Sequence, residues 1–240
     1  MRYLLAHVRD GLPEKVREKV AFSVHCHNDF GLATANTLAA VEEGVTYLHT
    51  CVAGFGERAG IAPFEEVVTA LELLYNIDSG VDLGRVYRLS QSAEKAFALP
   101  IQFHKPIIGD GIFAHEVDRE LEEMQAHPLL FEPFPPEIVG RETTLFIGRN
   151  TTQTLIQQLL EKAGVRASPR QMDELFRHIK GPQERLDKGE SQMTFYQVKK
   201  LVKELRKGYT MWDFWRLVEQ ITQQKPKLEE TGKKPDVEAS

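Results

Sequence analysis

Two short apolar runs, each followed by a helix-like segment, constrain the fold of this chain more than any other feature. The runs VAFSVHCH and VTYLHTCVAG are rich in β-branched residues and are typical of buried strands. Helix signals follow both runs, because Gly44 offers a left-handed stop and Pro63 suits a first helical turn. This alternation indicates βα units with parallel strands, and so an α/β fold. The predicted segments are strands over 20–27 and 45–54 and helices over 32–44, 62–76 and 82–98.

The chain changes character near residue 100. Short apolar pieces are then separated by proline and glycine, as in IQFHKPIIGDGIFAHE, which predicts a loop-rich linker region. Further on, helix-like segments begin after the capping residues Thr152, Ser168 and Thr194. The predicted organisation is a domain of βα units over 1–99, a linker over 100–150 with a helix over 117–127, a helical accessory domain over 151–224 and a disordered tail over 225–240.

Composition narrows the functional classes. The chain has 240 residues, of which 42% are hydrophobic and 27% charged, with a net charge of −5, as expected for a globular protein. A pI near 5.9 gives no reason to expect a nucleic acid or an anionic membrane as a partner. No apolar run approaches the ~20 residues that span a bilayer. Two cysteines form no disulfide framework, so we expect a cytoplasmic location.

Two histidines stand at the carboxyl-terminal end of the first predicted strand. Side chains alternate along a strand, so His25 and His27 should share one face while Cys26 takes the other. Two imidazoles at this spacing can reach one divalent ion, and strand ends of this kind carry the chemistry of α/β folds. The alternative is a hydrogen-bonded pair that closes an ordinary strand. His49, inside the second strand, is expected to be a hydrogen-bonded core residue.

A glycine-rich loop, GFGERAG (54–60), follows the second predicted strand. Its glycines permit positive φ angles and a close approach of the backbone to a ligand. They fit a tight turn between strand and helix equally well. Together with the histidines, the loop places a second candidate element at the same edge of the sheet.

The stretch HCHNDFGLATANTLAAVEEG, followed by GFGERAGIAPFEEVVTAL, resembles the family of homocitrate synthases and 2-isopropylmalate synthases. These are acyl-CoA-condensing, metal-dependent TIM barrels, and citramalate synthases belong with them. The similarity continues through KPIIGDGIFAHE, FEPFPPEIVGR and FIGRN, and so covers residues 16–205. Ile61 stands where isopropylmalate synthases usually carry asparagine, which favours homocitrate synthase.

The resemblance implies a condensation of acetyl-CoA with a 2-oxo acid, 2-oxoglutarate above all, in amino-acid biosynthesis or nitrogen fixation. The implied cofactor is a divalent metal, Mg, Mn, Zn or Co, held by two histidines and a carboxylate. His25 and His27 match the two histidine ligands. Glu57 and Arg58 are expected to form a buried pair at the barrel rim. The residues expected to orient the ligands or to contact substrate are Asn28, Asp29, Glu57 and Arg58.

The resemblance also shows what this chain lacks. The family's carboxylate ligand lies on the first barrel strand in a stretch like LRDGxQ. VRDGLP imitates it but aligns with the helix before the histidine strand, so Asp10 is not expected to bind metal. We interpret residues 1–99 as the last βα units of a TIM barrel, whose open edge needs a complementing chain in a homo- or hetero-oligomer. A split homocitrate synthase is the first hypothesis, and a truncated or decayed gene is the alternative.

The linker departs from the family pattern at two places. Glu120 stands where the family carries a linker histidine with an acid/base role, so it is the candidate catalytic residue if burial raises its pKa. The alternative is a solvated helix. A second histidine is lost where the family's GKHSG has become GRNTT. These losses leave two other functions open, a non-catalytic regulatory or structural subunit and a 2-isopropylmalate or citramalate synthase-like component.

Overall fold

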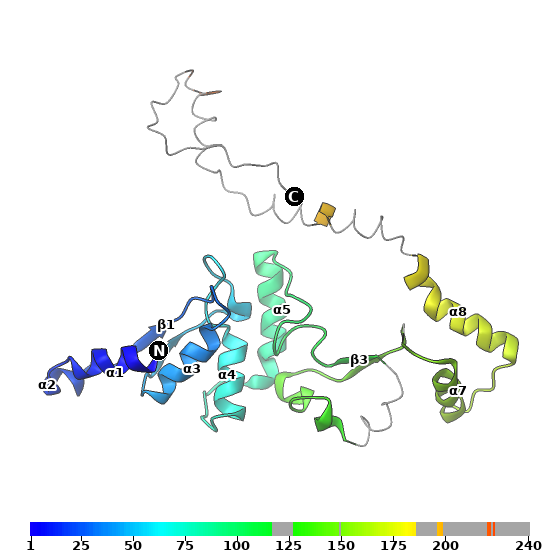
Figure 1. The fold of residues 1–240 in the computed structure, drawn as a ribbon, viewed down its shortest axis with the longest axis horizontal. Helices are drawn as coiled ribbons and strands as arrows, with labels where there is room; N and C mark the ends of the chain where they lie inside the picture. Colours follow the sequence, from blue (N-terminus) through cyan, green and yellow to red (C-terminus); the bar gives the residue numbers. More distant parts are fainter. Residues whose placement is uncertain (117–126, 149, 186–195, 199–219, 222, 224–240) are drawn as a thin grey trace. The chain divides into compact units, whose positions relative to one another are not determined.

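The computed structural model describes most of the first three-quarters of the chain and little beyond it (Figure 1). The described residues are 1–116, 127–148, 150–185, 196–198, 220, 221 and 223. The chain divides into two compact units, Met1–Ile179 and Lys180–Ser240. The predicted boundaries at residues 99 and 150 therefore both fall inside the first unit.

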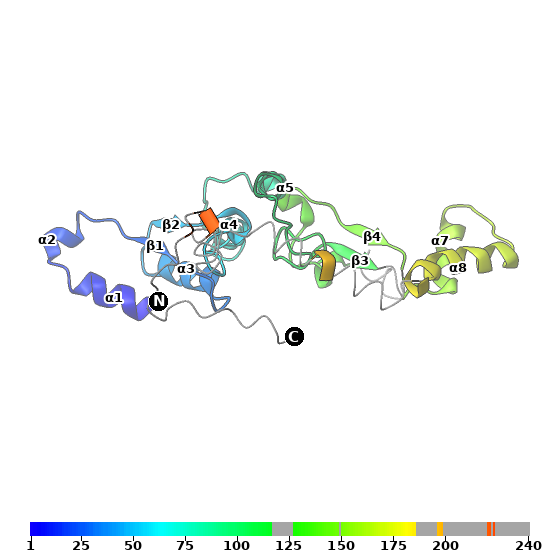
Figure 2. The ribbon, with the colours of Figure 1, turned by 90° about the horizontal axis from the view of Figure 1, so that it is seen from above.

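Helices and short strands alternate along residues 1–98, as predicted. The elements are α1 (Arg2–Asp10), α2 (Glu14–Arg17), β1 (Ser23–His25), α3 (Ala33–Glu42), β2 (Tyr47–His49), the 3-10 turn η1 (Val52–Gly54), α4 (Phe64–Leu73), the 3-10 turn η2 (Leu83–Arg85) and α5 (Val86–Phe97). β1 and β2 pair in parallel, with Val24 opposite Leu48 and His25 opposite His49. Figure 2 shows the two strands side by side. The α/β class is thus confirmed, although each strand is shorter than the apolar run that contains it.

Local signals explain where these helices begin and end. α3 ends just before Gly44, whose φ of 84° lies in the left-handed region that only glycine adopts without strain. Its first turn is capped by the side chain of Asn28, which accepts a hydrogen bond from Ala33 N at 3.1 Å. α4 begins directly after Pro63, and the two carboxylates of its first turn favour the positive end of the helix dipole.

The β1–β2 pair is covered by helices on one face only. Val24 is buried while Ser23 and His25 are exposed, which is the alternation expected of a strand packed on one side. The buried cluster joins this face to α3 and α4, with Leu5 of α1 packed against it. The residues of the cluster are Val24, Cys26, Ala33, Ala40, Val45, Ala62, Val67 and Leu71.

Within the described residues, β1 pairs with β2 alone, so each strand keeps an outer edge without a strand partner. Parallel sheets are ordinarily covered on both faces, and unpaired strand edges carry free backbone donors and acceptors. This pair has one bare face and two bare edges. It is therefore an incomplete sheet.

The predicted linker is firmly packed. Ile108 is buried together with Val68, Leu83 and Val86, so the loops after α5 share one apolar cluster with α4 and α5. A second parallel pair, β3 (Ala114–Glu116) with β4 (Thr144–Phe146), was not predicted. The 3-10 turns η3 (Pro128–Leu130) and η4 (Pro136–Val139) lie between these strands in sequence. The helix predicted over 117–127 lies outside the described residues apart from His127.

Two further helices begin where the capping residues predict. α7 (Gln153–Lys162) starts after Thr152, whose hydroxyl accepts a hydrogen bond from Leu155 N at 3.3 Å. α8 (Pro169–Arg185) starts after Ser168, which exchanges hydrogen bonds with Gln171 in a capping box. Most of the helices predicted beyond residue 194, and the predicted tail, lie outside the described residues. Among the helices that the structure describes, none is both long and apolar enough to cross a membrane.

Candidate functional site

Three imidazoles lie close together at the carboxyl-terminal end of the β1–β2 pair. The ring centroids of His25 and His27 are 5.0 Å apart, and those of His25 and His49 are 5.6 Å apart. His25 and His27 therefore share one side of the strand, as the alternation of side chains predicts. The expectation that His49 is a buried core residue was wrong. His49 is exposed because it lies on the face that no helix covers.

The His27 ring carries an unsatisfied nitrogen. Its Nδ1 atom is buried and finds no hydrogen-bond partner within the described part of the chain. A buried polar atom without a partner costs about 1–3 kcal/mol, so such atoms call for an explanation. A divalent metal would satisfy an imidazole nitrogen, and a second imidazole lies in ring contact beside it. The pair thus fits a metal by donor type and by position.

The ligand set is incomplete. Among residues 1–116, 127–148 and the other described stretches, no three His, Cys, Asp or Glu side chains are arranged to hold a metal ion. A structural or catalytic site ordinarily supplies three or four protein ligands. A complete site at His25 and His27 therefore needs at least one ligand from outside the described residues.

The GFGERAG loop closes over the ends of both strands. Asn28 N donates a hydrogen bond to Gly60 O at 2.9 Å, and Cys51 N donates one to Ala62 O at 3.1 Å. The chain at Gly60 thus lies against the strand ends next to the imidazoles. Gly60 has a φ of 84°, and a Cβ atom there would collide with the carbonyl oxygen of Gly54. The tight-turn role of this glycine is therefore established, whatever the loop binds.

An ion pair ties the GFGERAG loop to the loop after the histidines. Arg58 donates through Nε and Nη2 to the carboxylate of Asp29 at 2.9–3.2 Å. This hydrogen bond lowers the pKa of Asp29 and raises that of Arg58. The expected buried pair of Glu57 and Arg58 was wrong, because both residues are exposed and Arg58 reaches Asp29 instead.

The remaining candidates of this region are placed as follows. The Asn28 side chain caps α3, and Asp29 faces Arg58, so neither has an imidazole as its hydrogen-bond partner. Substrate contacts by Asn28, Asp29, Glu57 and Arg58 stay predictions. Glu120, the candidate acid/base, lies outside the described residues.

A buried carboxylate below the GFGERAG loop was missed. Glu65 is fully buried, and its Oε2 accepts a hydrogen bond from Ala53 N at 2.9 Å. Burial raises the pKa of Glu65. The pKa of the Cys51 thiol is also raised, mainly by burial of the thiol and to a lesser extent by the charge of Glu65. Ala53 itself has a φ of 56°, so the carboxylate holds a strained turn at the end of β2. In the sequence, Glu65 and Glu66 look like ordinary acidic residues of a first helical turn, which favour the positive end of the helix dipole. Nothing in the sequence pattern marks Glu65 as buried.

Lys105 joins the linker to the same helix. Its Nζ lies 2.6 Å from Glu66 Oε1 and 3.8 Å from Glu65 Oε1, and its side chain is largely buried. Glu66 also accepts a hydrogen bond from the Thr34 hydroxyl of α3. One lysine of the linker thus faces two carboxylates of α4, which fixes the linker beside the loop that follows β2.

A second histidine environment lies on β3. His115 Nε2 is 3.4 Å from Glu132 Oε1, an ion-pair distance at which the two groups are too poorly aligned for a hydrogen bond. Glu132 is 4% exposed and accepts a hydrogen bond from the Thr143 hydroxyl at 2.6 Å. His115 is thus half-buried with its Nε2 beside a carboxylate, whereas His25 is exposed.

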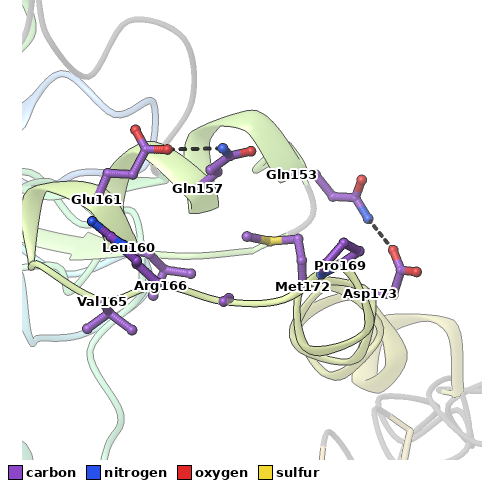
Figure 3. Close-up of a pocket in the computed structure, with 10 residues that line it drawn as sticks. Gln153, Gln157, Leu160, Glu161, Val165, Arg166, Pro169, Met172 and Asp173 are labelled. Atoms are coloured by element: carbon purple, nitrogen blue, oxygen red, sulfur yellow. Dashed lines mark hydrogen bonds between the residues drawn. The ribbon is translucent and has the colours of Figure 1, made fainter.

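A hollow of about 590 Å³ lies between α7 and α8 (Figure 3). Leu160, Val165 and Met172 give it an apolar lining. Hydrogen bonds from Gln157 to Glu161 and from Gln153 to Asp173 border it. Among the described residues, no histidine, cysteine or hydroxyl side chain lines this hollow, and its two carboxylates, Glu161 and Asp173, are engaged with Gln157 and Gln153.

Comparison with known proteins identifies the first part of the chain. The family model described as HMGL-like matches residues 3–92. Residues 3–92 are thus similar to the HMGL-like family. The match lies in the N-terminal part of this chain, within residues 1–99, where the βα units were predicted. The assignment of β1 and β2 to the last two strands of a barrel stays a prediction.

The chain is similar to three kinds of synthase. It is 40% identical over 166 residues to a 2-isopropylmalate synthase of Methanocaldococcus jannaschii, covering 68% of this chain and 32% of that protein. It is 37% identical over 169 residues to an (R)-citramalate synthase of the same organism, covering 70% and 34%. It is 33% identical over 205 residues to a homocitrate synthase of Methanothermobacter thermautotrophicus, covering 85% and 50%. The chain thus spans about a third to a half of the length of these curated relatives.

Proposed function

We propose that this chain is a component of an acyl-CoA-condensing synthase, in which acetyl-CoA reacts with a 2-oxo acid at a divalent metal. The observation that carries the proposal is the contact of His25 and His27 at a strand end, with His27 Nδ1 buried and unsatisfied. The names of the relatives, citramalate, isopropylmalate and homocitrate synthase, support the class of reaction.

The residues of the chain have distinct tasks in this proposal. His25 and His27 offer neutral imidazole nitrogens to the metal, and imidazole suits Zn and Co better than Mg or Mn. When bound, the metal would polarise the carbonyl of the 2-oxo acid and stabilise the charge that develops on its oxygen. The GFGERAG loop, fixed by Gly60 and by the Arg58–Asp29 pair, closes the strand ends beside the imidazoles.

We further propose that a complementing chain completes the site and the sheet. Three observations support this: the incomplete ligand set, the bare face of β1–β2, and the unpaired outer edges of both strands. The complementing chain would supply the remaining metal ligand and the neighbouring strands of a TIM barrel, in a homo- or hetero-oligomer. 2-Oxoglutarate as the acceptor, a role in nitrogen fixation, a cytoplasmic location and an acid/base role for Glu120 stay predictions.

One observation favours a second candidate, a non-catalytic regulatory or structural subunit. The described residues alone do not assemble three metal ligands. A subunit that has lost the chemistry would still pair with an intact homologue through the bare sheet edges. The two candidates differ in whether His25 and His27 are needed for turnover.

The deciding experiment starts with the chain tagged and gently purified from the organism that encodes it, with native and denatured masses recorded. If a second chain elutes in fixed proportion, CoA release is assayed with several 2-oxo acids, and zinc affinity is measured by calorimetry. We expect His25→Ala with His27→Ala to abolish both, beyond the ~10–100-fold loss typical of residues that only orient a ligand. The control is His104→Ala, an exposed histidine of the linker, which should change neither. Unchanged turnover in the double variant would favour the non-catalytic subunit.

A further inference from the structure

We infer that His49 is a positioning residue that orients the His25 ring for metal binding, through an edge-to-face contact across the β1–β2 pair. This inference rests on the metal site proposed for His25 and His27. It assigns a role to a residue of the second strand.

The strand register places the two residues together. His25 stands directly opposite His49, and directly opposite residues of paired strands are close enough for their side chains to interact. Their ring centroids are 5.6 Å apart and their planes meet at 85°. Aromatic rings favour this near-perpendicular arrangement, in which the positive edge of one ring meets the negative face of the other.

Two rings contact the His25 ring, one along its own strand and one across the strand pair. His27 contacts it at 5.0 Å and 65°, and His49 contacts it at 5.6 Å and 85°. Within the described part of the chain, these two rings are the aromatic groups that touch it. An exposed imidazole otherwise rotates among several rotamers, and each rotamer points its nitrogens in a different direction. Contacts with two neighbouring rings restrict that rotation, so His25 presents its nitrogens in a fixed direction before any metal binds.

A ligand role for His49 is a different hypothesis, and the geometry does not favour it. Across the described residues, no three such side chains are arranged to hold one ion, although His25 is in ring contact with both of the other imidazoles. A merely structural role fits poorly as well. His49 is exposed on the bare face and does not belong to the buried cluster around Val24.

Two substitutions separate these roles. His49→Phe keeps an aromatic ring beside His25 but removes both nitrogens, whereas His49→Ala removes the ring. We expect His49→Ala to weaken cobalt(II) binding about two- to tenfold, the range typical of one edge-to-face contact. His49→Phe should bind cobalt(II) within about twofold of the unaltered chain. Affinity is read from the cobalt absorption spectrum of the full chain, purified with any partner that accompanies it, and a thermal melt checks that each variant is folded.

The outcomes decide between the hypotheses. If His49→Phe binds as weakly as His49→Ala, a ring nitrogen is required and the positioning role is wrong. If neither substitution changes the affinity, His49 has no part in the site. His27→Ala serves as the reference: if cobalt(II) binds equally well to that variant, the metal site itself is wrong, whatever His49 does. If His27→Ala weakens cobalt(II) binding but the His49 variants do not, the metal site stands and only the positioning role of His49 is wrong.

Discussion

The two parallel strand pairs of this molecule, β1–β2 and β3–β4, use their histidines in opposite ways. Both pairs consist of three-residue strands in parallel register. On β1, His25 is exposed, and its ring contacts among the described residues are with two other imidazoles. On β3, His115 lies beside the buried carboxylate of Glu132, which also accepts a hydrogen bond from Thr143.

The comparison teaches that the surroundings of a strand pair, not its local structure, decide what its histidines can do. Helices cover one face of β1–β2 and leave the imidazoles on the other face open to a ligand. The surroundings of β3 instead supply a carboxylate to the histidine. We therefore expect substitutions around β1–β2 to affect ligand binding and loop geometry, and those around β3–β4 to affect stability alone.

The largest expected effect is that of Gly60→Ala. The added Cβ would collide with the carbonyl oxygen of Gly54, and φ at this position is 84°. We expect a loss of about 3 kcal/mol or more in the free energy of unfolding, because strain and overpacking add. Metal affinity at His27 should fall as well, since Gly60 O accepts the hydrogen bond of Asn28 N, next to His27. Urea denaturation and calorimetry measure the two effects.

Gly31→Ala is the matched control for that substitution. Gly31 has a φ of 72°, but an added Cβ would meet nothing within 4 Å. It therefore carries the backbone penalty without the collision, and we expect a loss of about 1 kcal/mol. Equal losses at the two glycines would show that the close approach of Gly60 to Gly54 does not exist in the protein.

The second largest effect tests the other strand pair. Glu132→Ala removes a buried carboxylate that faces the half-buried ring of His115 and the hydroxyl of the exposed Thr143. We expect a loss of about 2–3 kcal/mol in the free energy of unfolding, with metal affinity unchanged. The exposed Glu137 is the control, and Glu137→Ala should fall within about 0.5 kcal/mol of the unaltered chain. If Glu132→Ala also lowered metal affinity, the expectation that substitutions around β3–β4 affect stability alone would be wrong.

The strands and helices around β1–β2 could be predicted from the sequence because short, local sequence patterns mark them. Apolar runs marked both strands, Gly44 and Pro63 marked the helix ends, and the period of two placed His25 beside His27. β3 and β4 could not be predicted in this way. Each strand overlaps an apolar piece of only three residues, and their pairing depends on contacts between segments about 30 residues apart.

The features of the site that were missed or wrongly predicted depend on which face is covered. His49 reads as a core residue until it is known that helices cover only the opposite face. Arg58 stands next to Glu57 in sequence, yet it pairs with Asp29, 29 residues away. Glu65 looks like a surface residue of a first helical turn, but it is buried because the turn at Ala53 folds back over it. Such facts arise from tertiary packing, which a single sequence does not encode in any local pattern.

A smaller effect, dependent on pH, is expected at Glu65. Burial raises its pKa above the ordinary value of 4.5, so the folded state binds the proton more tightly than the unfolded state. The contribution of Glu65 to the free energy of unfolding is therefore fully present below pH 4.5. It is lost as the pH rises through the higher pKa that Glu65 has in the folded state. Glu65→Gln cannot ionise and keeps an acceptor for Ala53 N, so it should gain stability relative to the unaltered chain as the pH rises.

The measurement is the urea midpoint of both proteins between about pH 4 and pH 8. Glu66→Gln is the control, because Glu66 lies next in the same helix turn and is paired with Lys105 at 2.6 Å. If the urea midpoints of Glu65→Gln and the unaltered chain differ by the same amount at every pH, Glu65 keeps one protonation state throughout. The opposite slope would show that Lys105 outweighs burial.

The smallest effect is expected at the exposed pair of Arg58 and Asp29. Arg58→Gln removes the guanidinium that lowers the pKa of Asp29, so this pKa should return towards its ordinary value of 3.8. NMR titration of the Asp29 carboxyl carbon measures the change. Any loss of stability should be slight and should shrink with added salt, because both groups face solvent. Arg88→Gln, on an exposed position of α5, is the control and should leave Asp29 unchanged.

The same variant sharpens the comparison of the two strand pairs. If the Arg58–Asp29 pair only fixes the GFGERAG loop, Arg58→Gln should lower metal affinity by less than Gly60→Ala does, because the backbone hydrogen bonds of the loop remain. If Arg58 instead contacts the substrate, its loss should weaken binding of the 2-oxo acid while metal affinity and stability stay the same. A pKa of Asp29 that does not move in Arg58→Gln would show that the two loops are not joined in solution. The GFGERAG loop would then be held beside the imidazoles by its backbone hydrogen bonds.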